Sequence, residues 1–401
     1  MDRRNFCAMA AGAAVTVRLP VSQSVRQIVR QTASFRPPSQ SFLQDLPRLM
    51  EPGAVPGLSL AVLPGGRAAF THTVGTTGGE RPAPIGPDTM FEAASLSKPV
   101  FAYLVMLLVQ EGKLDLDRPL DQYLGSPYAP DDPRAAGITA RHVLSHTTGY
   151  RNWRFSADQK LTTDFAPGER FQYSGEGYYQ LQRVVEAVAG RGMAVLARER
   201  VLAPLGMSRS SYVWRSEFDT QAVQGHRRDG QPIPAQSRRT AVELGKLALA
   251  QGRTLEDWRH EDIVAALRAM SPPAPTHPVT LSPNAAGSLL TTANDYVKLV
   301  AVMIGAMPGP LDDELPRRMM TRQIGLRAGL GWGLGWGLEE REGRTLIWHW
   351  GDNPGFKNFV MADPTSKTGV IVFTNGDNGR ALYERVVRAS AGFDPTAFLW
   401  I

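Results

Sequence analysis

The chain contains the stretch Ser95-Leu96-Ser97-Lys98-Pro99-Val100-Phe101-Ala102-Tyr103-Leu104-Val105-Met106-Leu107-Leu108, in which two reactive side chains precede a long apolar run. A separation of three residues places Ser95 and Lys98 on one face of a helix. A serine hydroxyl is a poor nucleophile at neutral pH and needs a base within hydrogen-bond reach. Lysine is such a base only when burial or nearby positive charge lowers its pKa, and residues 99–108 can bury its stem. Because Ser-x-x-Lys also arises by chance, its setting decides its meaning.

The N-terminus has the features of an export signal. Arg3-Arg4 precedes Phe6 and a weakly apolar run over residues 7–17, which resembles a twin-arginine signal peptide. We assign residues 1–33 to this signal and a polar leader, and we expect a periplasmic or extracellular protein. A short amphipathic extension is the alternative.

The composition is that of a large globular chain. It has 401 residues, 43% of them hydrophobic, and a net charge of +6 that forms no basic run beyond pairs such as Arg227-Arg228. We therefore expect a sizeable core and no nucleic-acid partner. The single cysteine, Cys7, lies in the signal, so we expect no disulfide in the remainder. The apolar run 101–109 is too short to span a bilayer, and we expect no membrane segment apart from the signal.

Hydrophobic periodicity predicts strands near both ends of the chain and helices between them. Residues 34–401 are expected to form one domain, with a sheet lobe from 42–90 and 285–401 and a helical lobe from 91–284. This is an α+β fold, an antiparallel sheet built from both chain ends and flanked by helices, with the helical lobe inserted. Strands are predicted at 57–63, 67–74, 331–338, 344–350, 356–362 and 369–374, and helices at 42–50, 95–112, 140–146, 176–189, 193–203, 237–250, 254–270, 293–304 and 379–391.

The run Gly331-Trp332-Gly333-Leu334-Gly335-Trp336-Gly337 has no phosphate-loop spacing. Strand alternation over this run would place both tryptophans on one face of a strand, which favours a packing role over a ligand role.

Beyond Ser95-x-x-Lys98, six further motifs follow along the chain: TARHVLSHTTG at 139–149, FQYSGEG at 171–177, PLGM at 204–207, AGSLLTTAND at 286–295, HWG at 349–351 and NPGF at 353–356. In this order and spacing the chain resembles the serine hydrolases related to class C β-lactamases and penicillin-binding proteins, over about residues 42–391.

The resemblance implies roles for three side chains. Ser95 would be the acyl-accepting nucleophile, Lys98 its activating partner and Tyr173 the second proton-transfer group. A phenol with a pKa near 10 is a feeble base unless cations hold it towards phenolate, and Lys98 could supply that field. No metal or cofactor is implied.

The third catalytic motif has two candidates. His349-Trp350-Gly351 occupies the place of the family's Lys-Thr-Gly, whereas the literal Lys367-Thr368-Gly369 follows a turn sequence between two strands. We expect His349 to end a strand and lie at the site, and Lys367 to point into solvent.

Further residues are expected to bind substrate through the same resemblance. They are Gly175, Trp350, Gly351 and Asp352, and the backbone N–H groups of Ser95 and Asp352 would form the oxyanion hole.

One departure from the family pattern bears on specificity. Tyr173-Ser174-Gly175 stands where the family has Tyr-x-Asn, so the amide that would hold an acylamino group is missing. With His349 in place of lysine, both groups that recognise a penicillin or a peptidoglycan stem are weakened.

Other polar residues near the motifs carry weaker signals. His142 and His146 are four residues apart, but Val143 stands where a zincin has Glu, and no Cys or third His completes a metal set. We predict no metal site, and we expect His146 to satisfy backbone groups near the turn at 147–149. Glu176 is expected to be a surface carboxylate or a helix N-terminal acid.

The sequence thus predicts a serine hydrolase that acts through an acyl-enzyme on Ser95 and takes small ester or amide substrates. One alternative is a true β-lactamase or D-alanyl-D-alanine carboxypeptidase. The other is a non-catalytic, penicillin-binding-like sensor.

Overall fold

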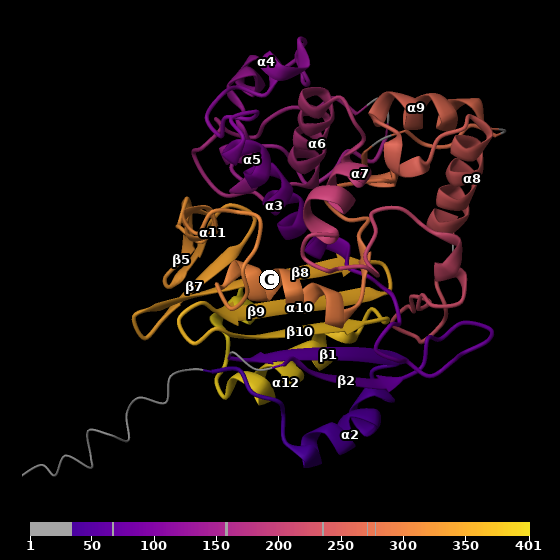
Figure 1. The fold of residues 1–401 in the computed structure, drawn as a ribbon, viewed down its shortest axis with the longest axis vertical. Helices are drawn as coiled ribbons and strands as arrows, with labels where there is room; N and C mark the ends of the chain where they lie inside the picture. The colour runs from indigo at the N-terminus through magenta and orange to yellow at the C-terminus, as the bar shows by residue number, and fades with distance from the viewer. Residues whose placement is uncertain (1–33, 66–67, 157–158, 235, 271, 277) are drawn as a thin grey trace, which may run out of the picture. The chain divides into compact units, whose positions relative to one another are not determined.

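The structure, a computed structural model, describes residues 34–401 apart from 66–67, 157–158, 235, 271 and 277. The predicted signal and Cys7 therefore lie outside the described residues. An eight-stranded antiparallel sheet runs in the order β2-β1-β10-β9-β8-β7-β6-β5 (Figure 1). Its strands are β1 (Gly57–Pro64), β2 (Phe70–Gly75), β5 (Ile324–Arg327), β6 (Leu330–Trp332), β7 (Gly337–Arg341), β8 (Arg344–Asn353), β9 (Phe356–Asp363) and β10 (Thr368–Thr374).

The two ends of the chain meet in the middle of this sheet. Strand β1 lies between β2 and β10, and Leu60 is opposite Val372 in the antiparallel register. Both strands are rich in β-branched and apolar residues and are buried over almost their whole length, as expected for a sheet covered on both faces. The predicted α+β class and the origin of the sheet in both chain ends are confirmed.

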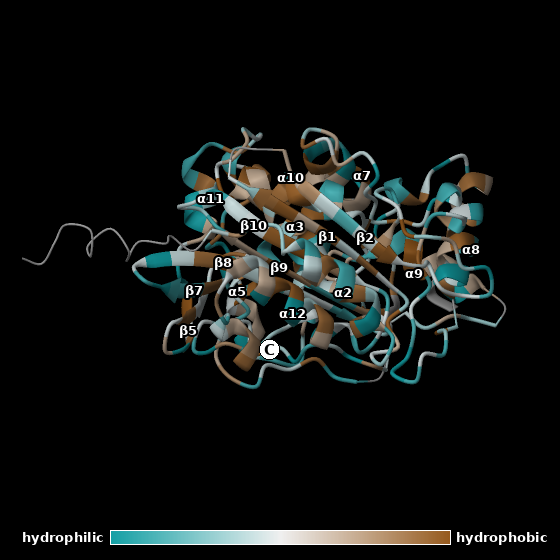
Figure 2. Ribbon diagram, turned by 90° about the horizontal axis from the view of Figure 1, so that it is seen from below, coloured by the Kyte–Doolittle hydropathy of each residue, from teal (hydrophilic) through white to brown (hydrophobic). Residues whose placement is uncertain are grey.

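Helices cover both faces of the sheet. Helix α10 (Ala293–Met303) packs on β1 and β10 from one side, and α12 (Gly379–Ala391) packs on β9 and β10 from the other. Helix α2 (Gln40–Met50) lies beside α12. The two faces form separate apolar cores, and in Figure 2 the apolar colour follows the strands between the helices.

The middle of the chain is helical, as predicted. Helix α3 carries the apolar run of the Ser95 segment and is buried along almost all of its length. The elements here are η1 (Ala94–Leu96), α3 (Ser97–Gln110), α4 (Asp121–Leu124), η2 (Pro133–Gly137), α5 (Ala140–Leu144), α6 (Gly175–Ala189), α7 (Met193–Ala197), η3 (Arg198–Leu202), η4 (Ser216–Asp219), α8 (Gln236–Ala250), η5 (Leu255–Asp257), α9 (His260–Ala269) and η6 (Pro278–Thr280). None of the helices in the described part of the chain is long and apolar enough to cross a bilayer.

Short elements escaped the sequence pattern because a few residues show no periodicity. The sequence did not predict β5, α4 or several other short elements. The fold also contains β3 (Phe91–Glu92), β4 (Leu290–Thr291), α11 (Glu314–Met319) and η7 (Thr396–Leu399).

The glycine–tryptophan run does not form the single strand that we predicted. Trp332 ends β6 and Trp336 precedes β7, so the run is a tight connection between two antiparallel strands. The tryptophans therefore pack into opposite cores, Trp332 beside β8 and Trp336 against the α3 side. Glycines make this turn possible: Gly335 has a φ of +85°, and a Cβ there would lie 2.5 Å from Ala102. The packing role is correct, but the shared face was wrong.

A buried polar chain connects α6 to the segment that lies against Lys98. The Gln182 side chain accepts a hydrogen bond from Ala285 N (2.8 Å) and donates to Glu186 (2.9 Å) and to the Pro283 carbonyl (3.2 Å). Burial raises the pKa of Glu186 to about 7, although hydrogen bonds from Gln182, His260 N and Met193 N oppose it. Gln182 thus holds residues 283–285 in place from inside the helical lobe.

The pKa of Glu186 predicts how stability changes with pH. Between pH 4.5 and 7 Glu186 releases a proton in the unfolded chain and retains it in the folded chain, so the contribution of this one group to the free energy of unfolding falls as pH rises. Glu186→Gln removes this dependence, which amounts to about 3 kcal/mol at most. Urea midpoints of both proteins at pH 5 and 7.5 test this, and equal changes in the two proteins would contradict it.

Candidate active site

Ser95 lies at the start of the buried helix, in the turn η1. The predicted helix over 95–112 begins later, because α3 starts at Ser97 and Ser95 belongs to the preceding 3₁₀ turn. Ala94 adopts a φ of +52°, a conformation that costs a non-glycine residue energy and that clusters at functional sites. Strain directly before Ser95 fixes the direction in which its hydroxyl leaves the backbone.

Lys98 is buried and faces the serine, as its spacing predicted. Its Nζ lies 3.0 Å from Ser95 Oγ and donates to the Ala286 carbonyl at 2.8 Å. Burial lowers the pKa of Lys98 to about 7, because the ammonium loses the water that would stabilise its charge. At neutral pH a large fraction of this amine is therefore free to accept a proton.

Tyr173 reaches the same place from the segment that leads into α6. The Lys98 Nζ lies 4.8 Å from the centre of its ring, and His146 packs on the ring at 4.2 Å between centroids. The backbone N–H of Ser174 donates to His146 Nδ1 at 3.1 Å, which ties the tyrosine segment to the histidine. The His146 ring therefore satisfies a backbone group, as predicted, but that group is the N–H of Ser174 and not one in the turn at 147–149.

The phenol is held in its protonated form. Burial raises the pKa of Tyr173, and the nearby Ser95 hydroxyl opposes that effect only in part. The Tyr173 phenol oxygen forms no hydrogen bond with the Ser95 hydroxyl or with any other described residue. The structure therefore gives no support to a shift towards phenolate, because desolvation and the charge of Asp352 both raise the pKa of Tyr173.

His349 lies on the inner face of β8, buried beside these groups. We predicted that His349 ends a strand, but it lies inside β8, which continues to Asn353. Burial and the charge of Lys98 lower the pKa of His349 to about 3, although a 2.7 Å hydrogen bond to the Trp350 carbonyl opposes the shift. That bond assigns the proton to Nδ1, so the buried Nε2 is an acceptor with no partner among the described residues.

The end of β8 approaches the serine turn closely. Strand β7 begins opposite Trp348, so residues 349–353 have no strand neighbour on that side, where η1 packs. A Cβ on Gly351 would lie 2.3 Å from the Ala93 carbonyl, so only glycine permits this approach. Asp352 follows, with its side chain 58% exposed and paired with Lys357 at 2.8 Å. The backbone N–H groups of Asp352 and Ser95 lie on the two segments that meet here. That they form an oxyanion hole stays a prediction.

Trp350 has a packing environment that its motif position did not reveal. Strand alternation turns its side chain away from the face of His349, towards Trp348 and Trp400. It also packs on Tyr173 with ring centroids 4.7 Å apart. Its side chain is half-buried, and its predicted contact with substrate remains a prediction.

Gly175 begins α6 beneath an aromatic side chain that sequence reasoning missed. A Cβ at Gly175 would lie 2.1 Å from Cζ2 of Trp153, so the indole ring rests directly on the glycine. No pattern links residues 153 and 175, because their contact depends on how a loop folds back over the helix.

Glu176 is completely buried, so the expectation of a surface carboxylate was wrong. It pairs with Arg154 at 2.6 Å and accepts a hydrogen bond from the Tyr128 hydroxyl at 3.0 Å. Its position in the first helical turn agrees with the predicted N-terminal acid, but its partners fasten the loop at Arg154 to α6.

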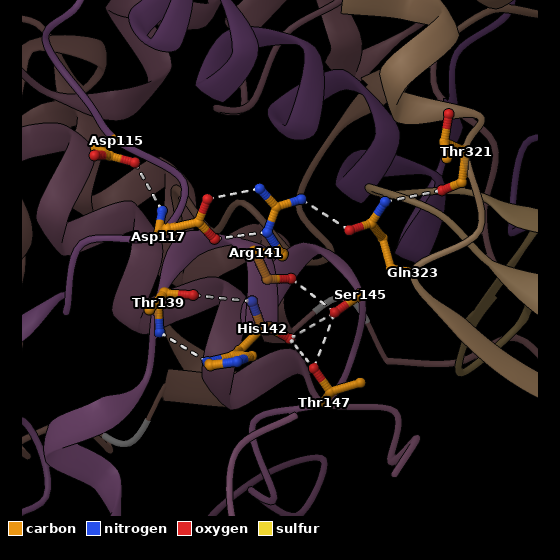
Figure 3. Close-up of polar contacts among 9 residues, drawn as sticks. All are labelled: Asp115, Asp117, Thr139, Arg141, His142, Ser145, Thr147, Thr321 and Gln323. Atoms are coloured by element: carbon orange, nitrogen blue, oxygen red, sulfur yellow. Dashed lines mark hydrogen bonds and ion pairs between the residues drawn. The ribbon is translucent and has the colours of Figure 1, made fainter. Parts of the chain in front are cut away.

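His142 belongs to a structural network (Figure 3). The backbone N–H of Thr139 donates to His142 Nδ1 at 3.2 Å, and the Thr139 hydroxyl accepts from His142 N, so the pair caps α5. In the same helix Arg141 pairs with Asp117 at 2.6 Å and donates to Gln323 at 2.8 Å. No group of three potential metal-ligating residues occurs within the described part of the chain.

Lys367 does not belong to the group of residues around Ser95. It is exposed in the turn between β9 and β10 and has a φ of +55°, so its predicted solvent position is confirmed.

Comparisons with known proteins place this arrangement in a family. Residues 43–393 match the family model described as Beta-lactamase. A class C beta-lactamase structure aligns with a TM-score of 0.67 at 16% identity, covering 88% of this chain and 95% of that one. A penicillin-binding protein homologue from Pyrococcus abyssi aligns with a TM-score of 0.65 at 23% identity, covering 84% and 74%. At these identities the structures establish the fold alone. The chain belongs to the beta-lactamase family.

Two curated relatives match parts of the chain. Esterase EstB from Burkholderia gladioli is 31% identical over 202 residues, which are 43% of this chain and 50% of the esterase. Penicillin-binding protein 4* from Bacillus subtilis (strain 168) is 30% identical over 165 residues, which are 36% of this chain and 35% of that protein. The chain therefore matches half or less of the length of each relative.

The buried amine predicts the pH dependence of activity. With Lys98 as the base for Ser95, as the sequence predicts, kcat/KM should rise with pH through an apparent pKa near 7 and then level off. His349, with a pKa of about 3, and Tyr173, with a raised pKa, should add no inflection between pH 5 and 9. Lys98→Arg, which stays protonated, should lose about 10³-fold or more. Initial rates across this range test the profile, with Lys367→Ala as a control that keeps it, and a flat wild-type profile would contradict it.

The close approach at Gly351 predicts a local steric effect. Gly351→Ala would push the end of β8 away from Ala93 and misplace the backbone N–H of Asp352. A displacement of about 1 Å can reduce turnover by about 10²-fold. Measurement of kcat together with the thermal midpoint tests this, and an alanine variant with unchanged kcat would contradict the close contact.

Proposed function

We propose that the chain is a serine hydrolase that cleaves small esters or amides through an acyl-enzyme on Ser95. The observation that carries this proposal is the Lys98 amine, buried 3.0 Å from Ser95 Oγ with a pKa of about 7. A hydroxyl becomes a nucleophile when a base of this pKa is held within hydrogen-bond reach.

In the first half-reaction Ser95 Oγ attacks the substrate carbonyl carbon and passes its proton to Lys98. The negative charge that forms on the carbonyl oxygen is stabilised by the backbone N–H groups of Ser95 and Asp352. Collapse of this tetrahedral intermediate breaks the bond to the leaving group. Tyr173 donates its phenolic proton to the leaving oxygen or nitrogen and regains a proton from Lys98.

In the second half-reaction water replaces the leaving group. Neutral Lys98, acting directly or through Tyr173, accepts a proton as the water oxygen attacks the acyl carbon. Collapse then breaks the bond to Ser95 Oγ, and the serine recovers its proton. No step uses a charge on His349, whose uncharged Nε2 instead offers a hydrogen-bond acceptor to the substrate.

The polar groups of the site favour esters over penicillins and peptidoglycan stems. His349 is uncharged, so it cannot form an ion pair with a substrate carboxylate, and Gly175 offers no amide to an acylamino group. The similarity to an esterase supports the same preference. A true β-lactamase or D-alanyl-D-alanine carboxypeptidase is the second candidate, because a class C beta-lactamase and a D-alanine carboxypeptidase share this fold.

Active-site labelling tests the proposal directly. A fluorophosphonate probe should label the wild-type protein, and Ser95→Ala should abolish the label and lower hydrolysis of p-nitrophenyl acetate by several orders of magnitude. Nitrocefin should be hydrolysed far more slowly than the ester.

The outcomes separate the candidates. Fast nitrocefin turnover would favour the β-lactamase, whereas a folded wild-type protein with neither label nor turnover would favour a non-catalytic sensor.

A further inference from the structure

We infer that Trp153 determines the acyl-group preference of the site, and that it selects apolar or aromatic acyl chains. The inference rests on the proposed function and extends it to a substrate class.

The position of Trp153 is the first observation. Its indole lies on Gly175, where a Cβ would be 2.1 Å from Cζ2 and 2.5 Å from Cε2. The ring therefore fills the space that a side chain at 175 would use, two residues after Tyr173. The flat apolar face of an indole attracts hydrocarbon and aromatic groups, but it cannot satisfy both the donor and the acceptor of an acylamino group.

The second observation is that hydrogen bonds hold the loop that carries Trp153 in place. The Arg154 guanidinium donates to buried Glu176 at 2.6 Å and 3.0 Å, and the backbone N–H of Arg154 donates to the same carboxylate at 3.3 Å. Asn152 completes the attachment, since its side-chain oxygen accepts from Gly175 N and its carbonyl from Glu176 N, both at 2.8 Å. Hydrogen bonds on both sides of Trp153 thus hold the indole over the start of α6.

The third observation concerns the strength of this attachment. Glu176 is fully buried, and the Arg154 side chain is only 25% exposed, so the pair is largely removed from water. Charge-assisted bonds of this kind are stronger and geometrically more specific than neutral ones. Glu176 and Arg154 are therefore positioning residues, which act on substrate through the placement of Trp153.

The ratio of kcat/KM for p-nitrophenyl hexanoate to that for p-nitrophenyl acetate tests the inference. Loss of an apolar contact to the acyl chain should lower this ratio in Trp153→Ala by about tenfold or more. Trp153→Phe, which keeps an aromatic face, should recover most of the ratio. Gly175→Ala, which places a methyl group where the ring lies, should lower it in the same direction.

A neighbouring residue provides the matched control. Phe155 belongs to the same loop and is 69% exposed, so Phe155→Ala should leave the ratio unchanged. Glu176→Gln should lower the ratio with a larger effect on KM for the hexanoate than on kcat for the acetate. A protein that has merely lost stability would lose both substrates equally.

Labelling distinguishes failure of this inference from failure of the proposed function. If Trp153→Ala reacts with the fluorophosphonate probe and keeps the wild-type ratio, the role of Trp153 is wrong and the hydrolase proposal stands. Equal changes of the ratio in Phe155→Ala and Trp153→Ala would also overturn it. If the wild-type protein neither labels nor hydrolyses either ester, both proposals fail.

Discussion

The Lys98 amine lies in an apolar interior, between the Ser95 hydroxyl and the Ala286 carbonyl, and burial lowers its pKa to about 7. A charged amine there would lack the hydration that stabilises it in water, and none of the carboxylates that the structure describes forms an ion pair with it. The surrounding fold maintains this environment. Helix α3 supplies the apolar walls, and Gln182 holds the segment that ends at the Ala286 carbonyl.

The same burial determines the charge state of the neighbouring groups. The pKa of His349 and that of His146 are lowered by burial and by the charge of Lys98, so both rings are neutral at the pH where Lys98 titrates. Burial raises the pKa of Tyr173, which keeps its proton. The site therefore contains an amine that titrates near neutral pH, a phenol that keeps its proton and a neutral imidazole, which are the charge states that the proposed acyl transfer requires.

Close backbone approaches, and not side-chain chemistry, bring these groups together. Gly351 lets β8 reach the turn before Ser95, and Gly175 lets Trp153 lie on the start of α6. At both positions a side chain would occupy space that another segment of the chain already fills. Strain at Ala94, with a φ of +52°, is maintained because the packed segments around it leave no alternative.

The sequence by itself determined the facing pair of Ser95 and Lys98, the sheet built from both chain ends, and the preference for His349 over Lys367. These features follow from local periodicity and turn composition and from the order of the motifs along the chain, all of which can be read directly from the sequence. Only the tertiary structure decided that Trp153 covers Gly175, that Glu176 is a buried anchor, that the two tryptophans of the glycine run face opposite cores, and that Tyr173 stays protonated. Each of these depends on contacts between distant segments and on the exclusion of water, and neither can be read from spacing along the chain.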